Sequence, residues 1–284
     1  PFCNSCQKIF NMVNYDIKKW LHSLLFQNDF TIRKEGSTLL RFIYVLIRNL
    51  HRAWMIPQAG YYAVRERKYS EEFRYQYDLK MIRQMMKTAR ISTSVYGRDN
   101  LPATGGYVMF PNHQGKYDAL GIMYGHPLPC SVVMDDARSH MPLVSQFIDL
   151  VKGKRIKLHD IRQAARIIHE VSQETAQGRK FIIFPAGGYK HRNGNHVDPF
   201  KPGTFKSAMK VKAPIVPVAL VDSWKVYDLN SLRRVHTQVY FLKPLYYEDY
   251  KDMKSVEVCD LVYRRVCKAV RLGERNLPEL AVRC

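Results

Sequence analysis

Short apolar runs alternate with amphipathic helical patterns through most of the chain beyond Gly97. Runs typical of buried strands lie at 107–110, 131–134, 155–158, 181–184, 215–220 and 235–242. Between or after these runs, apolar residues recur at helical spacing. They predict one helix that begins near Asp118 and others at 143–151, 160–178, 205–211 and 255–272. Strands and helices that take turns in this way predict an α/β fold, with a mostly parallel sheet flanked by helices.

The stretch 39–64 has a different, two-sided pattern. Arg41, Arg48 and Arg52 fall on one face of a helix. The opposite face carries apolar and aromatic residues, namely Leu40, Ile43, Tyr44, Ile47, Leu50 and Trp54. Such a helix either lies in a membrane interface or packs on its own domain, and the pattern alone leaves both possibilities open. No stretch has the ~20 nearly uncharged apolar residues that a membrane span needs.

A further helix is predicted to begin after Ser70, an N-cap residue followed by the acidic first turn Glu71 and Glu72. An apolar face follows at four-residue intervals, formed by Phe73, Tyr77, Met81 and Met85. We therefore predict an amino-terminal helical segment over residues 1–90, which is membrane-associating if the first of the two possibilities holds, and an α/β domain over residues 91–284. Residues 1–38 show no clear period.

The excess of basic residues indicates an anionic partner. The 284 residues include 45 Lys and Arg against 25 Asp and Glu, a formal net charge of +20 that no single tail accounts for. Nucleic acid, an anionic membrane surface and phosphorylated small molecules would all fit. Cys3 and Cys6 form an isolated C-x-x-C without a second pair at zinc-site spacing, so we interpret them as thiols in a reducing compartment.

Two polar loops stand where the ligand crevice of a parallel sheet is expected, just after the carboxyl ends of strands. The first runs from Asn112 to Asp118 and the second from Pro185 to Lys190. In the first loop a histidine, His113, precedes Asp118 at H-x4-D spacing. The carboxylate can hold one ring nitrogen protonated and leave the other free to accept a proton. The alternative is an aspartate that caps a helix beside a surface histidine. No G-x-S-x-G nucleophile motif is present, so a base here would act on a substrate hydroxyl.

Four ordered blocks over residues 95–245 carry a family resemblance. The segment 110–118, F-P-N-H-Q-G-K-Y-D, resembles the N-H-x4-D block of the glycerolipid acyltransferases, in particular the lysophosphatidic acid acyltransferase branch. The segments 183–188, 200–205 and 213–218 resemble the F-P-E-G-T-R, F-K-x-G and P-I-V-P-V blocks of that family.

The resemblance implies that residues 91–284 form an acyltransferase domain. His113 would deprotonate the free hydroxyl of a lysophospholipid, Asp118 would orient His113, and the oxygen would attack a thioester of coenzyme A or acyl carrier protein. The product from 1-acylglycerol-3-phosphate is phosphatidic acid. Substrate-binding roles are implied for Asn112, Gly115, Lys116, Arg155, Lys157, Ala186, Gly187, Gly188 and Lys190.

The same resemblance implies no metal or redox cofactor. It implies an anionic phospholipid surface as a partner, at the cytoplasmic face of a membrane, with peripheral or monotopic attachment. Nucleic acid is not expected, since the basic residues are dispersed and form no recognisable nucleic-acid-binding motif.

Three positions depart from the family pattern. Leu158 stands where an arginine that binds the acceptor phosphate is usual, and Arg155 or Lys157 would have to replace it. Alternatively, Lys152, Lys154, Arg155 and Lys157 form a solvated basic face on lipid head groups. Tyr189 stands where arginine is common, with Lys190 and Arg192 as nearby charges.

Ala186 replaces the glutamate of the third block, and an alanine cannot accept the hydrogen bonds of a carboxylate. The chain is then either a natural variant with altered substrate handling or an engineered, weakened form, and we favour the second hypothesis. Acylation of another hydroxyl lipid and a catalytically weakened lipid-binding role remain alternatives.

Overall fold

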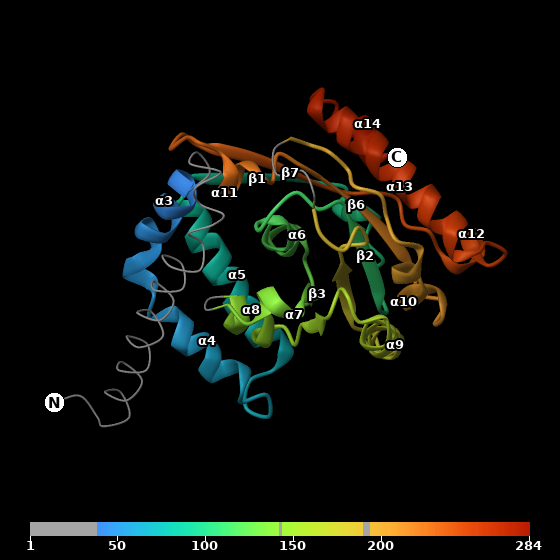
Figure 1. Cartoon of the computed structure of the whole chain (residues 1–284), viewed down its shortest axis with the longest axis horizontal. Coiled ribbons are helices and arrows are strands. Elements are labelled where there is room, and N and C mark those ends of the chain that lie inside the picture. The colour runs from blue at the N-terminus through green and yellow to red at the C-terminus, as the bar shows by residue number, and fades with distance from the viewer. Residues whose placement is uncertain (1–38, 142–143, 190–193) are drawn as a thin grey trace.

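A computed structural model describes residues 39–141, 144–189 and 194–284 (Figure 1). Cys3, Cys6, Lys190 and Arg192 lie outside the described residues. Within the described part, seven strands form one sheet in the order β1-β7-β6-β2-β5-β3-β4. Their bounds are β1 Ile91–Tyr96, β2 Tyr107–Pro111, β3 Ser131–Asp135, β4 Lys154–Ile156, β5 Lys180–Ile183, β6 Ile215–Val221 and β7 Val235–Phe241.

Most neighbouring strands are parallel, as the alternation of strands and helices predicted. Strand β2 pairs in parallel with both β5 and β6, so that Val108 lies beside Phe181 and Ile215. The exception is β7, which is antiparallel to β6 and parallel to β1. Because β2 lies in the middle of the sheet, the loop that follows it is surrounded by the ends of several other strands.

Helices cover both faces of the sheet. The longer ones are α3 Leu39–Asn49, α4 Met55–Ala63, α5 Glu71–Thr88, α6 Asp118–Gly125, α8 Val144–Leu150, α9 Ile161–Ala176 and α13 Ser255–Glu274. The short ones are η1 Leu50–Arg52, η2 Arg98–Asn100, α7 Asp136–Ser139, η3 Pro202–Phe205, α10 Lys206–Met209, α11 Lys225–Asp228, α12 Tyr247–Tyr250 and α14 Pro278–Val282. Figure 1 shows α3, α4 and α5 on one side of the molecule and α12, α13 and α14 on the other.

Each strand contributes alternate residues to two hydrophobic cores, as the two-residue period of a strand requires. In β2, Val108 and Phe110 point to the core shared with α9 and α13, whereas Tyr107 and Met109 point to the core shared with α3, α5 and α6. All four side chains are fully buried. Helices α3 and α5 therefore pack on the sheet itself, whereas the buried residues of α4 form a separate cluster with residues of α5 and α8. The proposed domain boundary at residue 91 stays a prediction.

The predicted strands and helices lie close to their observed bounds, with two differences. Strand β1 was not predicted, because its sequence I-S-T-S-V-Y is half polar and only Ile91 is buried. The predicted apolar face of α5 is partly wrong, since Phe73 is 42% exposed. The buried residues of α5 include Tyr75, Leu79 and Ile82, which place the core-facing side of the helix nearer to those positions.

Helix α3 packs in the opposite sense to most amphipathic helices. The basic face contacts the protein: the Arg41 side chain is completely buried, and Arg48, although exposed, donates from Nε to the Thr88 carbonyl oxygen. The apolar face is exposed, at 49% for Leu40, 41% for Ile43 and 66% for Ile47. Among the described residues, no helix combines the length and apolar character needed to cross a bilayer.

A buried histidine on the α6–β3 connection predicts a pH dependence of stability. His126 Nε2 accepts a hydrogen bond from the Tyr107 hydroxyl at 2.6 Å, and Nδ1 donates to the Leu128 carbonyl oxygen at 2.6 Å. Burial lowers the pKa of His126 to about 4 from an ordinary value of 6.5. The unfolded chain therefore takes up a proton first as the pH falls below about 6.5. The stability present above that pH is lost progressively toward pH 4.

We expect the free energy of unfolding to fall by about 2 kcal/mol between pH 7.5 and pH 5 because of this residue. Denaturant titrations at the two pH values, on the wild type and on His126→Gln, measure the difference. Glutamine is the replacement because its amide can both donate and accept a hydrogen bond but does not titrate. Equal pH dependence in the two proteins would contradict the prediction.

Candidate active site

The first polar loop joins the carboxyl end of β2 to the first turn of α6. Its chain path brings His113 back over Asp118, the first residue of α6. The His113 Nδ1 atom lies 2.6 Å from Asp118 Oδ2, and the His113 side chain remains 18% exposed while that of Asp118 is completely buried. The pair predicted from its spacing is thus in direct contact.

The Asp118 carboxylate accepts hydrogen bonds from several directions. Besides the His113 contact, Oδ2 accepts from the backbone N–H groups of Gln114 at 2.5 Å and Gly115 at 2.9 Å. The other oxygen, Oδ1, accepts from the Ser223 hydroxyl at 2.5 Å. A buried carboxylate with such donors is fixed in orientation. With Nδ1–H donating to Asp118, Nε2 is the nitrogen left to accept a proton.

Two buried side-chain amides connect the loop to the end of β6 by hydrogen bonds. Asn112 donates from Nδ2 to the Leu220 carbonyl oxygen at 3.0 Å and accepts from the Leu220 N–H at 2.7 Å. Gln114 donates to Leu220 O and to Asn195 Oδ1, and accepts from the Ser223 N–H. Asn112 was expected to bind substrate. In the structure its amide is completely buried and pairs with β6, so it holds the loop in place.

Two aromatic rings, one just before the second polar loop and one within it, pack on His113. The Phe184 ring lies 4.3 Å from the imidazole at an angle of 30°, and the Tyr189 ring meets it nearly edge-on at 4.7 Å. Tyr189 stands where the family carries arginine, so a ring occupies the position expected for a cation. These contacts restrict the orientation of the imidazole.

The glycines of the second loop adopt conformations that other residues avoid. Gly187 has φ +74° and Gly188 has φ +145°. A Cβ on Gly187 would lie 2.7 Å from the Lys201 ammonium nitrogen, so the lysine of the F-K-x-G segment rests against this loop. Ala186 is partly buried and packs against the core shared with α9 and α13.

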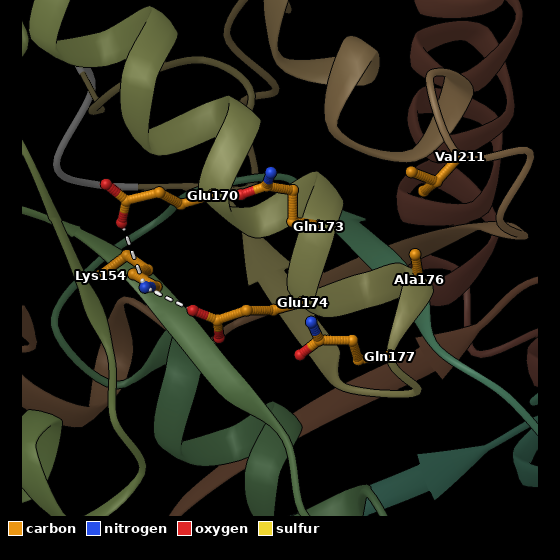
Figure 2. A pocket seen from close by; sticks show the side chains of 7 residues that line it. All are labelled: Lys154, Glu170, Gln173, Glu174, Ala176, Gln177 and Val211. Atoms are coloured by element: carbon orange, nitrogen blue, oxygen red, sulfur yellow. Dashed lines mark hydrogen bonds and ion pairs between the residues drawn. The ribbon is translucent and has the colours of Figure 1, made fainter.

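The basic residues around β4 are paired within the protein. Figure 2 shows Lys154 between Glu170 and Glu174 of α9, at 3.2 and 2.5 Å. Arg155 donates to Asp149 at 2.7 Å and to the Ser139 hydroxyl. An open pocket of about 650 Å³ lies here, lined by Lys154, Glu170, Gln173, Glu174, Ala176, Gln177 and Val211. It shares no residue with the loop after β2.

These ion pairs occupy side chains that were expected to bind phosphate. Lys152 also forms an ion pair, with Glu66. Of the four basic positions, Lys157 is exposed and makes only a backbone contact, from its N–H to Gln163. The guanidinium of Arg155 would have to leave Asp149 before it could bind a phosphate. Much of the predicted basic face is thereby neutralised locally.

The two remaining loop positions face the helices above the site. Lys116 is exposed, and its ammonium lies 5.0 Å from the centre of the Phe42 ring of α3. Gly115 is buried, and a Cβ there would lie 3.5 Å from both Asp228 Oδ2 and Trp224 Cα. The loop thus lies close to the segment after β6 as well as to α3. No cluster of His, Cys, Asp or Glu among the described residues could hold a metal ion.

Sequence reasoning missed several residues of the site. The hydrogen-bond network around Asp118 includes Gln114, Asn195 and Ser223. The sequence did not indicate any of them as a site residue. Ser223 follows the carboxyl end of β6 by two residues, so the rule that selected the other two loops would also have pointed there. Asn195 has no such signal, because it reaches the site from an irregular segment.

The chain is similar in sequence to several known proteins. Residues 92–221 match the family model Acyltransferase. This stretch, a little under half of the chain, is therefore similar to the acyltransferase family. A 1-acyl-sn-glycerol-3-phosphate acyltransferase from Borreliella burgdorferi is 25% identical over 152 residues, which cover 54% of this chain and 60% of that protein. The alpha form from Mus musculus is 28% identical over 164 residues, covering 55% and 56%.

The acyltransferase fold itself is seen in a solved structure. The crystal structure of the 1-acyl-sn-glycerophosphate acyltransferase PlsC from Thermotoga maritima has a TM-score of 0.67 at 18% identity, and covers 84% of this chain and 96% of that one. These matches confirm the predicted fold class and the resemblance to the lysophosphatidic acid acyltransferase branch. The chain spans a little over half the length of the two curated relatives.

The conformation of Gly187 generates a prediction. Any side chain at φ +74° costs about 1–2 kcal/mol, and a Cβ would also displace the Lys201 ammonium. We expect Gly187→Ala to lower the thermal midpoint by about 2–8 °C. Gly203→Ala is the control, because a Cβ at Gly203 meets nothing within 4 Å. Equal midpoints for the two variants would show that the loop can relax.

Proposed function

We propose that this protein moves a fatty acyl group from a thioester donor to the free hydroxyl of 1-acylglycerol-3-phosphate at a membrane surface. The observation that carries the proposal is the contact of 2.6 Å between His113 and the buried, fully hydrogen-bonded Asp118 carboxylate. The printed names of the relatives support the choice of acceptor. Acyl-CoA and acyl carrier protein are both compatible donors.

The proposed reaction proceeds by general-base catalysis. His113 Nε2 accepts the proton of the acceptor hydroxyl as its oxygen attacks the thioester carbonyl carbon. Asp118 keeps the imidazole in the required tautomer and stabilises its positive form. As the carbon–sulfur bond breaks, the imidazolium returns its proton to the thiolate, and the ester and a free thiol leave. General-base help of this kind contributes ~10²–10⁴-fold. The chemistry requires neither a metal nor a redox cofactor.

The exposed apolar face of α3 and α4 supports a lipid surface as the partner. Leu40, Ile43 and Ile47 of α3 are exposed, and so are Leu50 in η1 and the residues that flank α4, Trp54 and Val64, at 65%, 57% and 77%. A row of large apolar side chains in water is unfavourable, and the interface of a bilayer offers it an apolar environment. The net charge of +20 adds attraction to anionic lipids. Attachment at the cytoplasmic face, peripheral or monotopic, is part of this proposal.

The residues expected to bind the acceptor phosphate suggest a second candidate function. Arg155 is held by Asp149, and Leu158 occupies the arginine position of the family. These observations favour an acyltransferase that acts on another hydroxyl lipid, should lysophosphatidic acid fail as an acceptor. Lys116 and Lys201 are the cations that lie against the two site loops and could bind an acidic head group.

A first prediction concerns the proposed base. His113→Ala removes it, and we expect acyl transfer to fall by about 10²–10⁴-fold in protein that still folds. The assay follows thioester consumption with lysophosphatidic acid on anionic vesicles. His169→Ala, an exposed histidine of α9, is the matched control and keeps full activity. Full activity of His113→Ala would refute the mechanism.

A second prediction concerns lipid binding. Replacing Ile47 and Leu50 by Ser removes two exposed apolar side chains, and we expect vesicle co-sedimentation to weaken roughly tenfold or more. The control is the double replacement of Ile161 and Val256 by Ser, since these side chains are 84% and 61% exposed on α9 and α13. If both double variants bind equally, α3 is not the docking face.

A third prediction tests the hypothesis of a weakened form. Ala186→Glu restores the family's carboxylate, and we expect it to raise the rate of acyl transfer. Unchanged activity in the same assay would mean that Ala186 does not limit the rate.

A further inference from the structure

The segment 222–233, which joins β6 to β7, contacts both the lipid-facing helix α3 and the catalytic carboxylate. It begins directly after the last residue of β6, Val221, and includes the short helix α11. At its start lies Ser223, which is 3% exposed. Its later part lies under α3. The segment is therefore the physical link between the outer helix and the site.

On the catalytic side, the link is a hydroxyl group. The Ser223 Oγ donates to Asp118 Oδ1 at 2.5 Å, and the Ser223 N–H donates to Gln114 Oε1 at 2.9 Å. Both acceptors are buried. Since the other carboxylate oxygen is the one that contacts His113, a movement of Ser223 would let the carboxylate rotate and would misalign the imidazole.

On the outer side, the link is the buried guanidinium of Arg41. It donates from Nε to the Val226 carbonyl at 3.1 Å, and from Nη1 to the carbonyls of Ser231 and Arg233 at 3.0 and 2.7 Å. From Nη2 it donates to the Ala89 carbonyl at the end of α5. One rigid guanidinium thus binds carbonyl groups of α11 and of the later end of the segment, which an ammonium could not do with the same geometry.

Aromatic contacts reinforce this connection. The Phe42 ring of α3 lies 5.9 Å from the Tyr227 ring of α11, and the Lys116 ammonium of the catalytic loop lies 5.0 Å from the same Phe42 ring. Residues that follow each other in α3 therefore touch the segment and the loop that carries His113. Any shift of α3 reaches the site by two routes.

We propose that Ser223 is a positioning residue for the His113–Asp118 pair, and that Arg41 couples docking of α3 on a lipid surface to that position through the segment 222–233. The proposal rests on the proposed function, because it takes the lipid surface as the partner of α3. A surface that binds the exposed face of α3 stabilises the helix in its place on the protein. By linkage, it then stabilises the Arg41 hydrogen bonds and the arrangement of Ser223.

The Ser223 part is tested without any substrate. The Nδ1–H proton of a histidine bonded to a carboxylate gives a low-field NMR resonance, which is assigned here by its loss in His113→Ala. We expect Ser223→Ala to shift or broaden this resonance and Ser223→Thr to restore it. Ser131→Ala is the control, since Ser131 is a buried serine that donates to the Lys152 carbonyl. An unchanged resonance in Ser223→Ala would overturn the positioning role.

The same variants also separate positioning from binding in the acyl-transfer assay. We expect Ser223→Ala to lower kcat about 10–100-fold with little change in KM, because the base is misaligned while the substrate contacts remain. A fall in stability alone would not produce that split. An increase in KM at constant kcat would assign Ser223 to substrate binding instead.

The Arg41 part is tested by hydrogen exchange of the full chain with and without mixed phosphatidylcholine–phosphatidylglycerol vesicles. In the wild type we expect vesicles to slow exchange in 40–64, 112–118 and 222–233. In Arg41→Met the slowing is confined to 40–64. Arg74→Met is the matched control and responds as the wild type, because Arg74 is another buried arginine that donates to a backbone carbonyl, that of Leu150. If Arg41→Met does not fold, Arg41→Lys keeps the charge without the fork and takes its place.

The outcomes distinguish the two levels of the argument. The coupling would be overturned if vesicles slowed exchange in the wild type only at 40–64, or did not slow it at all. It would also be overturned if exchange at 112–118 and 222–233 slowed equally in Arg41→Met. None of these measurements needs turnover. A wild type that shows the expected exchange pattern and no acyl transfer would refute the proposed function and leave the coupling standing.

Discussion

The buried carboxylate of Asp118 is the constraint on which the arrangement of the site depends. A charge that is completely removed from water must be compensated by donors, and here they come from His113, from two backbone N–H groups and from Ser223. These donors belong to the loop after β2 and to the segment after β6. One ionised group thus fixes the relative positions of two strand ends and gives the imidazole a single orientation.

Much of this arrangement could be predicted from local sequence. The strands of the parallel sheet are short apolar runs between helical patterns, and the loops after β2 and β5 were selected because polar residues follow those runs. Strand β1 escaped prediction because it has a polar, partly exposed face. The pair His113 and Asp118 was found because its members are close in the chain and the turn between them is tight.

The contacts that sequence reasoning missed join residues far apart in the chain. Ser223 and Asp118 are separated by 105 positions, and Arg41 and Val226 by 185. No periodicity connects such residues. The sequence also did not show that the basic residues near β4 form ion pairs within the protein. Their carboxylate partners lie on α8, on α9 or before α5, as in the pair of Lys154 with Glu170 and Glu174 (Figure 2).

The orientation of α3 has a consequence for the protein away from lipid. A helical pattern shows two faces but does not say which one is buried, and here four backbone carbonyls draw the arginine face inward. The apolar row is left facing water. In a detergent-free preparation this row would associate with its own copy on a second molecule. The apparent size of the protein in solution would then depend on its concentration and on the amphiphiles present.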